Sequence, residues 1–112
     1  MVKAVKLEGS SMCPLFRAGD IALVSLTPCA AVPPFGLAPG DCVVYRYEGR
    51  RLLHRVLAVD GFGLLVADDS GRIAAHHVAW QDIEGRVLSR NPLKKGFTGL
   101  LYSNLKRTLS FA

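Results

Sequence analysis

Two adjacent serines near the start of the chain could carry nucleophilic chemistry. Ser10 and Ser11 lie in a short polar break, GSSMCP, at positions 9–14. A serine hydroxyl is a weak nucleophile by itself, and it attacks a carbonyl only when a neighbouring base takes its proton. Serines are equally common in polar turns that do no chemistry. The choice between nucleophile and turn depends on whether the chain supplies a base.

A histidine in the middle of the chain is the best candidate for that base. His54 interrupts the apolar run LLHRVL at positions 52–57, and an imidazole exchanges a proton near neutral pH. A hydrogen-bonded structural histidine is the alternative interpretation. A Ser–Lys pair on a central strand is not favoured, because the lysines lie toward the two ends of the chain, as Lys3, Lys6, Lys94, Lys95 and Lys106.

The order of these residues resembles the two sequence boxes of the signal peptidase and LexA-type serine peptidase superfamily. The first box, Gly-x-Ser-Met-x-Pro followed by Gly-Asp, is similar to GSSMCPLFRAGD at 9–20. The second, Gly-Asp, a hairpin and then the base with Arg-Val, is similar to GDCVVYR and LLHRV. The likeness covers about residues 5–90. Its histidine at position 54 is typical of the signal peptidases of archaea and the endoplasmic reticulum, whereas other members carry lysine.

The resemblance implies a role for each matching residue. Ser11, rather than Ser10, matches the nucleophile and His54 the general base. Asp69, in LLVADDSG at 64–71, matches an aspartate that orients the imidazole, although Asp-Ser-Gly is also an ordinary turn. Ser10 would help backbone N–H groups to hold the oxyanion, and Met12 would pack under the substrate site.

The sequence departs from the family pattern at two places within the matching residues, and it shows no transmembrane anchor of the kind that the family's signal peptidases normally have. A further aspartate downstream of Asp69 is missing, because RIAAHH occupies 72–77, and a hydroxyl two residues before the nucleophile is replaced by Gly9. His76 and His77 in that segment are interpreted as a surface pair, because no further ligand spacing supports a metal site. We expect no metal and no cofactor.

Short strands separated by turn residues predict an all-β domain. The expected strands are 2–7, 21–26, 42–47, 51–59, 62–68 and 83–89, with a further strand from Arg72. The resemblance makes this a LexA/signal-peptidase-like coiled β fold, and a short helix follows it. We divide the chain into a β domain at 1–96 and an amphipathic helix at 97–112. The helical face holds Phe97, Leu100, Leu101, Leu105 and Leu109. It is expected to pack on the β core, and the alternative is contact with a membrane or a partner.

Composition limits the partners and the compartment. The 112 residues suit one domain, and half are hydrophobic, which argues against disorder. The net charge of +5 is scattered, so a nucleic-acid partner is not favoured. Three cysteines without a CxxC pair indicate free thiols in a reducing compartment, with a Cys29–Cys42 disulfide as the alternative. No signal peptide or membrane-spanning run is found, so we expect a cytoplasmic protein, or one held peripherally at a membrane.

The resulting prediction is a serine endopeptidase that cleaves a peptide or leader segment. Its activity is expected to rise with pH as His54 loses its proton, and a flat profile between pH 5 and 8 would count against His54 as the base. Two alternatives stay open: a non-catalytic peptide-binding module of the same fold, and a LexA-type regulatory domain that cleaves itself. The sequence names neither the substrate nor the oligomeric state.

Overall fold

The computed structural model describes residues 2–6, 12, 15, 19–26, 37–71, 74–89 and 91–110. Within them, seven strands form one antiparallel sheet in the order β1-β2-β7-β3-β4-β5-β6. The strands are β1 (Val2–Lys6), β2 (Ile21–Leu26), β3 (Cys42–Tyr47), β4 (Arg50–Val59), β5 (Gly63–Ala67), β6 (His76–Ala79) and β7 (Ile83–Leu88). Two short 3₁₀ turns, η1 (Trp80–Asp82) and η2 (Pro92–Lys94), and one helix, α1 (Gly96–Ser110), complete the described elements.

The predicted all-β character is confirmed, with the strands close to their expected positions. The segments 21–26 and 42–47 match β2 and β3, and the other predicted strands that pair in the sheet differ by a residue or two at their ends. The strand expected from Arg72 begins only at His76, and Arg72 itself lies outside the described residues. The two 3₁₀ turns were not predicted, because three residues give too short a pattern to detect.

The β3–β4 hairpin follows directly from its turn residues. Tyr47 pairs with Arg50, which leaves a two-residue loop of Glu48 and Gly49. Both loop residues have positive φ, 52° and 77°. This geometry matches the twist of the flanking strands, and glycine adopts it without steric cost.

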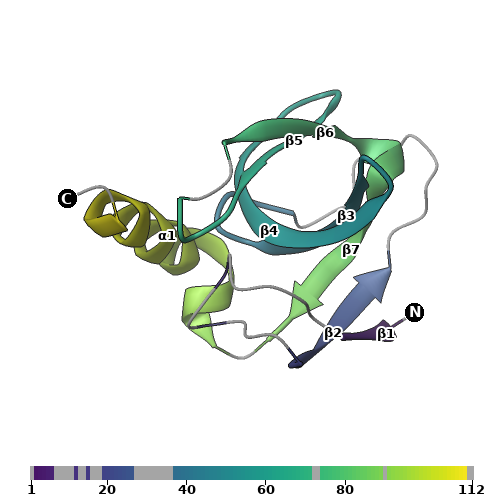
Figure 1. The fold of residues 1–112 in the computed structure, drawn as a ribbon, viewed down its shortest axis with the longest axis horizontal. Coiled ribbons are helices and arrows are strands. Elements are labelled where there is room, and N and C mark those ends of the chain that lie inside the picture. Colours follow the sequence, from purple (N-terminus) through teal and green to yellow (C-terminus); the bar gives the residue numbers. More distant parts are fainter. Residues whose placement is uncertain are drawn as a thin grey trace.

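The sheet is strongly coiled, and β3 is covered on both faces. Figure 1 shows β3 to β6 curling round one end of the molecule, while β1, β2 and β7 extend below. Inside the curl lies a cluster of Val43, Tyr45, Val56, Leu64, Val66, Val78 and Ile83. The other face of β3 contributes to a second cluster, of Val5, Met12, Val24, Cys42, Val44 and Val87. Burial on both faces explains why β3 begins as an unbroken apolar run instead of alternating.

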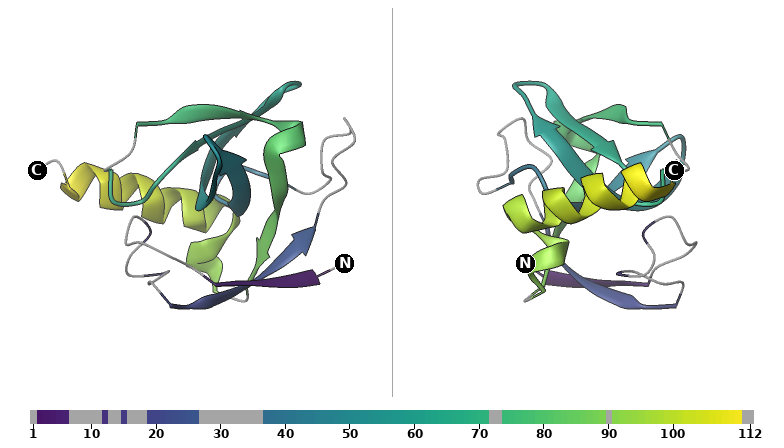
Figure 2. Two further views of the ribbon diagram at one scale, coloured as in Figure 1. Left: turned by 45° about the vertical axis from the view of Figure 1, so that its right-hand side comes forward. Right: turned by 90° about the vertical axis from the view of Figure 1, so that its left-hand side faces the viewer.

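Helix α1 contacts the sheet through its small residues. Gly99 and Ser103 are buried, and a Cβ at Gly99 would lie only 2.7 Å from Nη1 of Arg55 and 2.7 Å from the carbonyl oxygen of Gly40. Only glycine therefore allows this close approach. Figures 1 and 2 show the helix running past the curled strands, with its C-terminal end projecting away. Among the described residues, no helix is both long and apolar enough to cross a membrane.

The apolar face of α1 points outward. The exposed fractions are 72% for Phe97, 53% for Leu101, 61% for Leu105 and 64% for Leu109. The expectation that this face packs on the β core is therefore wrong for these four residues, and of the predicted face only Leu100 is half-buried. The reason is the close contact at Gly99, which turns the small-residue face of the helix inward. Contact of the apolar face with a membrane or a partner stays a prediction.

Removing one of these exposed side chains should cost little stability. We expect Leu105→Ala to change the free energy of unfolding by less than about 0.5 kcal/mol, because an exposed leucine loses little burial on truncation. The matched control is Leu64→Ala inside the curl, where the loss should be about 2–5 kcal/mol. Urea denaturation measures both. A loss for Leu105→Ala close to that of the control would mean that another surface covers the apolar face of α1 in solution.

Candidate functional site

The two serines of the predicted site, Ser10 and Ser11, lie outside the described residues. Their neighbour Met12 is described, and it is 3% exposed. Its Sδ accepts a hydrogen bond of 3.3 Å from the backbone N–H of Asp69, at the turn that follows β5. Met12 also belongs to the cluster beneath β3. The structure thus places Met12, from the first sequence box, against the segment that contains the predicted orienting aspartate.

His54 lies inside the curled sheet and forms a hydrogen bond to a tyrosine. Its side chain is 1% exposed, and its Nδ1 lies 2.7 Å from the hydroxyl oxygen of Tyr45 on the neighbouring strand β3. The same hydroxyl lies 2.9 Å from Nε2 of His76 on β6. Nδ1 of His76 is in turn 3.0 Å from the carbonyl oxygen of Ala74. A continuous hydrogen-bonded chain therefore runs from His54 to a backbone carbonyl.

Strand register explains why these three side chains meet. His54 is paired with Val43, and Tyr45 is two residues further along β3, so both side chains point to the same face. Val56 is paired with Val66 and Val66 with His76, which continues that face across β5 to β6. The face is the interior of the curl, where these valines belong to the apolar cluster.

The interpretation of His76 and His77 as a surface pair is correct for only one of them. His77 is exposed, and its Nε2 lies 2.9 Å from Oδ2 of Asp60. His76 is half-buried and stacks near Tyr47, with ring centroids 4.3 Å apart. Adjacent residues of a strand point to opposite faces, so alternation along β6 could have predicted that only one of the two histidines is exposed. The partner Tyr45 could not be found without the register.

Burial keeps His54 neutral. Removal from water lowers the pKa of His54 from 6.5 to about 4; the charge of Asp68 raises it, His76 lowers it, and Asp69 raises it. His54 is then already a neutral base at pH 5. The expected rise of activity between pH 5 and 8 therefore no longer follows from His54 itself, because its titration is moved to lower pH. A flat profile in that range does not exclude His54.

Asp69 forms a buried ion pair with Arg55. Nε and Nη2 of Arg55 donate to the two carboxylate oxygens of Asp69, at 3.2 and 2.8 Å, and both side chains are fully buried. Nη1 of Arg55 also donates to the carbonyl oxygens of Gly40 and Leu93, each at 2.8 Å. Arg55 therefore joins the turn before β3, the turn after β5 and η2. The predicted contact of Asp69 with His54 stays a prediction, and its partner Arg55 was not predicted from the sequence.

Asp68 is a second buried carboxylate beside the imidazole. It is fully buried, and its Oδ2 accepts a hydrogen bond of 2.7 Å from Ser70. Of the charges that act on the pKa of His54, its effect is the largest. Asp68 therefore gives a protonated His54 more electrostatic support than Asp69 does. Asp68 was not among the site residues predicted from the sequence.

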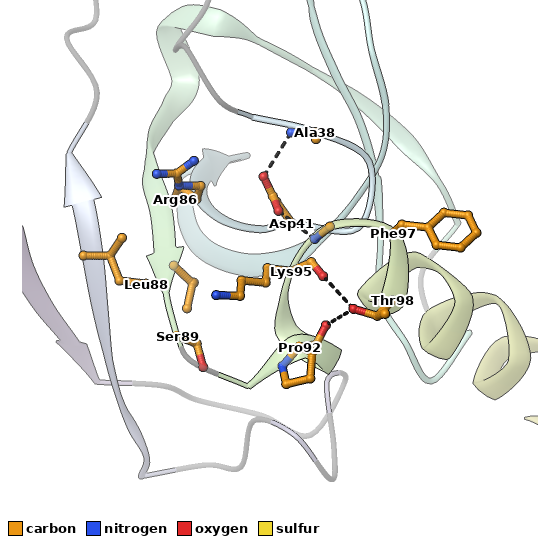
Figure 3. Close-up of a pocket in the computed structure, with 11 residues that line it drawn as sticks. Ala38, Asp41, Arg86, Leu88, Ser89, Pro92, Lys95, Phe97 and Thr98 are labelled. Atoms are coloured by element: carbon orange, nitrogen blue, oxygen red, sulfur yellow. Dashed lines mark hydrogen bonds between the residues drawn. The ribbon is translucent and has the colours of Figure 1, made fainter.

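The second Gly-Asp pair organises a hollow beside the start of α1. Asp41 accepts hydrogen bonds from the backbone N–H of Ala38, at 3.0 Å, and of Gly96, at 2.8 Å. A pocket of about 620 Å³ opens there; Figure 3 shows Arg86 and Lys95 among its lining side chains. Of the predicted site residues that the structure describes, none lines this pocket. Asp41 therefore has a structural role at the junction of β3 and α1.

The described thiol is inert. Cys42 is free and buried, so the alternative of a Cys29–Cys42 disulfide is wrong; Cys13 and Cys29 lie outside the described residues. Burial raises the pKa of Cys42 to about 12, which leaves almost no thiolate at neutral pH. In the described part of the chain, no three His, Cys, Asp or Glu side chains gather in a group that could hold a metal ion.

Comparisons with protein-family models, with curated proteins and with solved structures gave no match to this chain.

Proposed function

We propose that the protein is a serine endopeptidase with a LexA/signal-peptidase-like coiled β fold, in which Ser11 is the nucleophile and His54 the general base. One observation carries the proposal. Met12, the chain neighbour of Ser11, is hydrogen-bonded to the turn after β5, and the charges of that turn act on the buried His54. Met12, from the first family box, and Arg55, from the second, are both hydrogen-bonded to Asp69 in this turn.

The chemistry follows from the states of these groups. Ser11 Oγ attacks the scissile carbonyl carbon while His54 takes the hydroxyl proton, and backbone N–H groups with the Ser10 hydroxyl hold the oxyanion. The buried carboxylates of Asp68 and Asp69 stabilise the imidazolium, since both raise the pKa of His54. The imidazolium protonates the leaving amine, and water then hydrolyses the acyl-enzyme by the same steps.

The substrate class is an extended peptide or leader segment. Among the described strands, β1 and β6 form the two edges of the sheet, and an edge strand offers backbone groups that pair with such a peptide. β6 also carries His76, which is linked to His54 through Tyr45. The resemblance implies small residues before the cut. A membrane contact would use the exposed face of α1.

A non-catalytic peptide-binding module is the second candidate. The observation that favours it is the burial of His54, which is 1% exposed and hydrogen-bonded to Tyr45. Buried, satisfied histidines of this kind are common structural residues. Such a module would bind peptides along a sheet edge without cleaving them.

One comparison of variants tests the peptidase proposal. Wild-type protein and Ser11→Ala are incubated with a proteome-derived peptide library, and new termini are read by mass spectrometry. We expect termini that only the wild type produces, because the variant lacks the nucleophile. Ser25→Ala, which removes a hydroxyl from β2, is the matched control and should cleave like the wild type.

The contrary result is equally informative. Identical termini for wild type and Ser11→Ala, with both proteins folded, would refute the peptidase in favour of the binding module. Capture of peptides from the same library by the Ser11→Ala protein would then identify what the module binds.

A further inference from the structure

We propose that Tyr45 and His76 set the tautomer of His54, so that its Nδ1 carries the proton and its Nε2 is left as the basic nitrogen. The inference deepens the proposed function, on which its catalytic meaning rests. The two residues would do what a carboxylate does in a Ser-His-Asp triad, where it holds the imidazole in the reactive tautomer.

The tautomer follows from the hydrogen-bond chain, one bond at a time. A carbonyl oxygen can only accept, so Nδ1 of His76 must donate to Ala74. Nε2 of a neutral His76 then has no proton and accepts from the hydroxyl of Tyr45, 2.9 Å away. The hydroxyl has one proton, which this bond uses. Its oxygen must therefore accept from Nδ1 of His54, 2.7 Å away.

The surroundings keep each group in the required state. Burial raises the pKa of Tyr45, so its hydroxyl retains the proton that it donates to His76. Burial also lowers the pKa of His54, so the imidazole is neutral and has one N–H to give to Tyr45. The bond between Tyr45 and His54 is buried, and the bond between Tyr45 and His76 is partly buried, so water competes weakly for both.

The tautomer can be measured without any substrate. Long-range ¹H–¹⁵N correlation spectra of protein labelled in histidine show which ring nitrogen carries the proton, and His54→Gln assigns the His54 signals. At neutral pH we expect the proton on Nδ1 of His54 in the wild type. A proton on Nε2 would overturn the proposal.

Three variants test the cause. Tyr45→Phe and His76→Leu each remove a different member of this series of hydrogen bonds. In both variants the proton of His54 should move to Nε2. His76→Gln places an amide oxygen near the position of Nε2, where it accepts from Tyr45 and cannot be protonated, so it should preserve the wild-type tautomer. An unchanged tautomer in both breaking variants, with their folds intact, would refute the roles of Tyr45 and His76.

Activity measurements separate this proposal from the peptidase proposal. On a peptide that the wild type cleaves, Tyr45→Phe and His76→Leu should lower kcat by about 10²-fold or more with little change in KM, and His76→Gln should restore most of it. The expected tautomer with no cleavage by the wild type would refute the peptidase and leave the tautomer assignment standing. Cleavage by a wild type in which His54 carries its proton on Nε2 would refute the tautomer assignment and leave the peptidase proposal standing.

Discussion

Replacing Arg55 by methionine is expected to lower the free energy of unfolding by about 3–5 kcal/mol. The variant leaves the fully buried carboxylate of Asp69 without its ion-pair partner. It also removes the donor from the carbonyl oxygens of Gly40 and Leu93, which hold the turn before β3 and η2 in place. Urea denaturation followed by circular dichroism measures the loss.

Two further variants make this result specific. Arg51→Met, on the same strand, removes a partly exposed arginine that pairs with Glu84, and it should cost less than about 1 kcal/mol. Adding Asp69→Asn to Arg55→Met removes the buried carboxylate charge that has lost its partner, so the double variant should be more stable than Arg55→Met. Equal losses for Arg55→Met and Arg51→Met would contradict the buried ion pair.

Acidification should destabilise the protein through His54. The pKa of His54 is about 4 in the folded protein, against 6.5 for the exposed side chain. Between these two values the unfolded chain binds a proton that the folded protein does not, so stability falls as pH falls from about 6.5 to about 4. The shift corresponds to a loss on the order of 3 kcal/mol, complete below pH 4.

A difference measurement isolates this contribution. The free energy of unfolding is measured at several values between pH 7 and 4 for the wild type and for His54→Gln, which cannot titrate. Contributions from groups that do not interact with His54 are the same in both proteins and cancel in the difference. The wild type should lose stability more steeply over this window. Parallel curves would show that His54 titrates normally, and hence that it is not buried in solution.

Local patterns were sufficient to predict most of the described strands. The strands at 21–26 and 42–47 were found because a short apolar run bounded by turn residues is a local pattern. The face of α1 was found in the same way, since its periodicity is local. Its direction was not, because the contact at Gly99 depends on Arg55 and Gly40, which come from other segments.

In the candidate site, too, local patterns predicted some features and contacts between distant segments decided others. Residue types and order were enough to single out Ser11, His54 and Asp69, and to suggest acyl-transfer chemistry. The partners of these residues depend on strand register, which pairs positions far apart in the chain and decides which side chains share a face. Strand register places Tyr45 between His54 and His76, and tertiary packing pairs Asp69 with Arg55. The all-β class and the candidates for the reactive residues thus follow from local sequence, whereas the partners of His54 and Asp69 and the low pKa of His54 follow from burial and long-range contacts, which are not local properties.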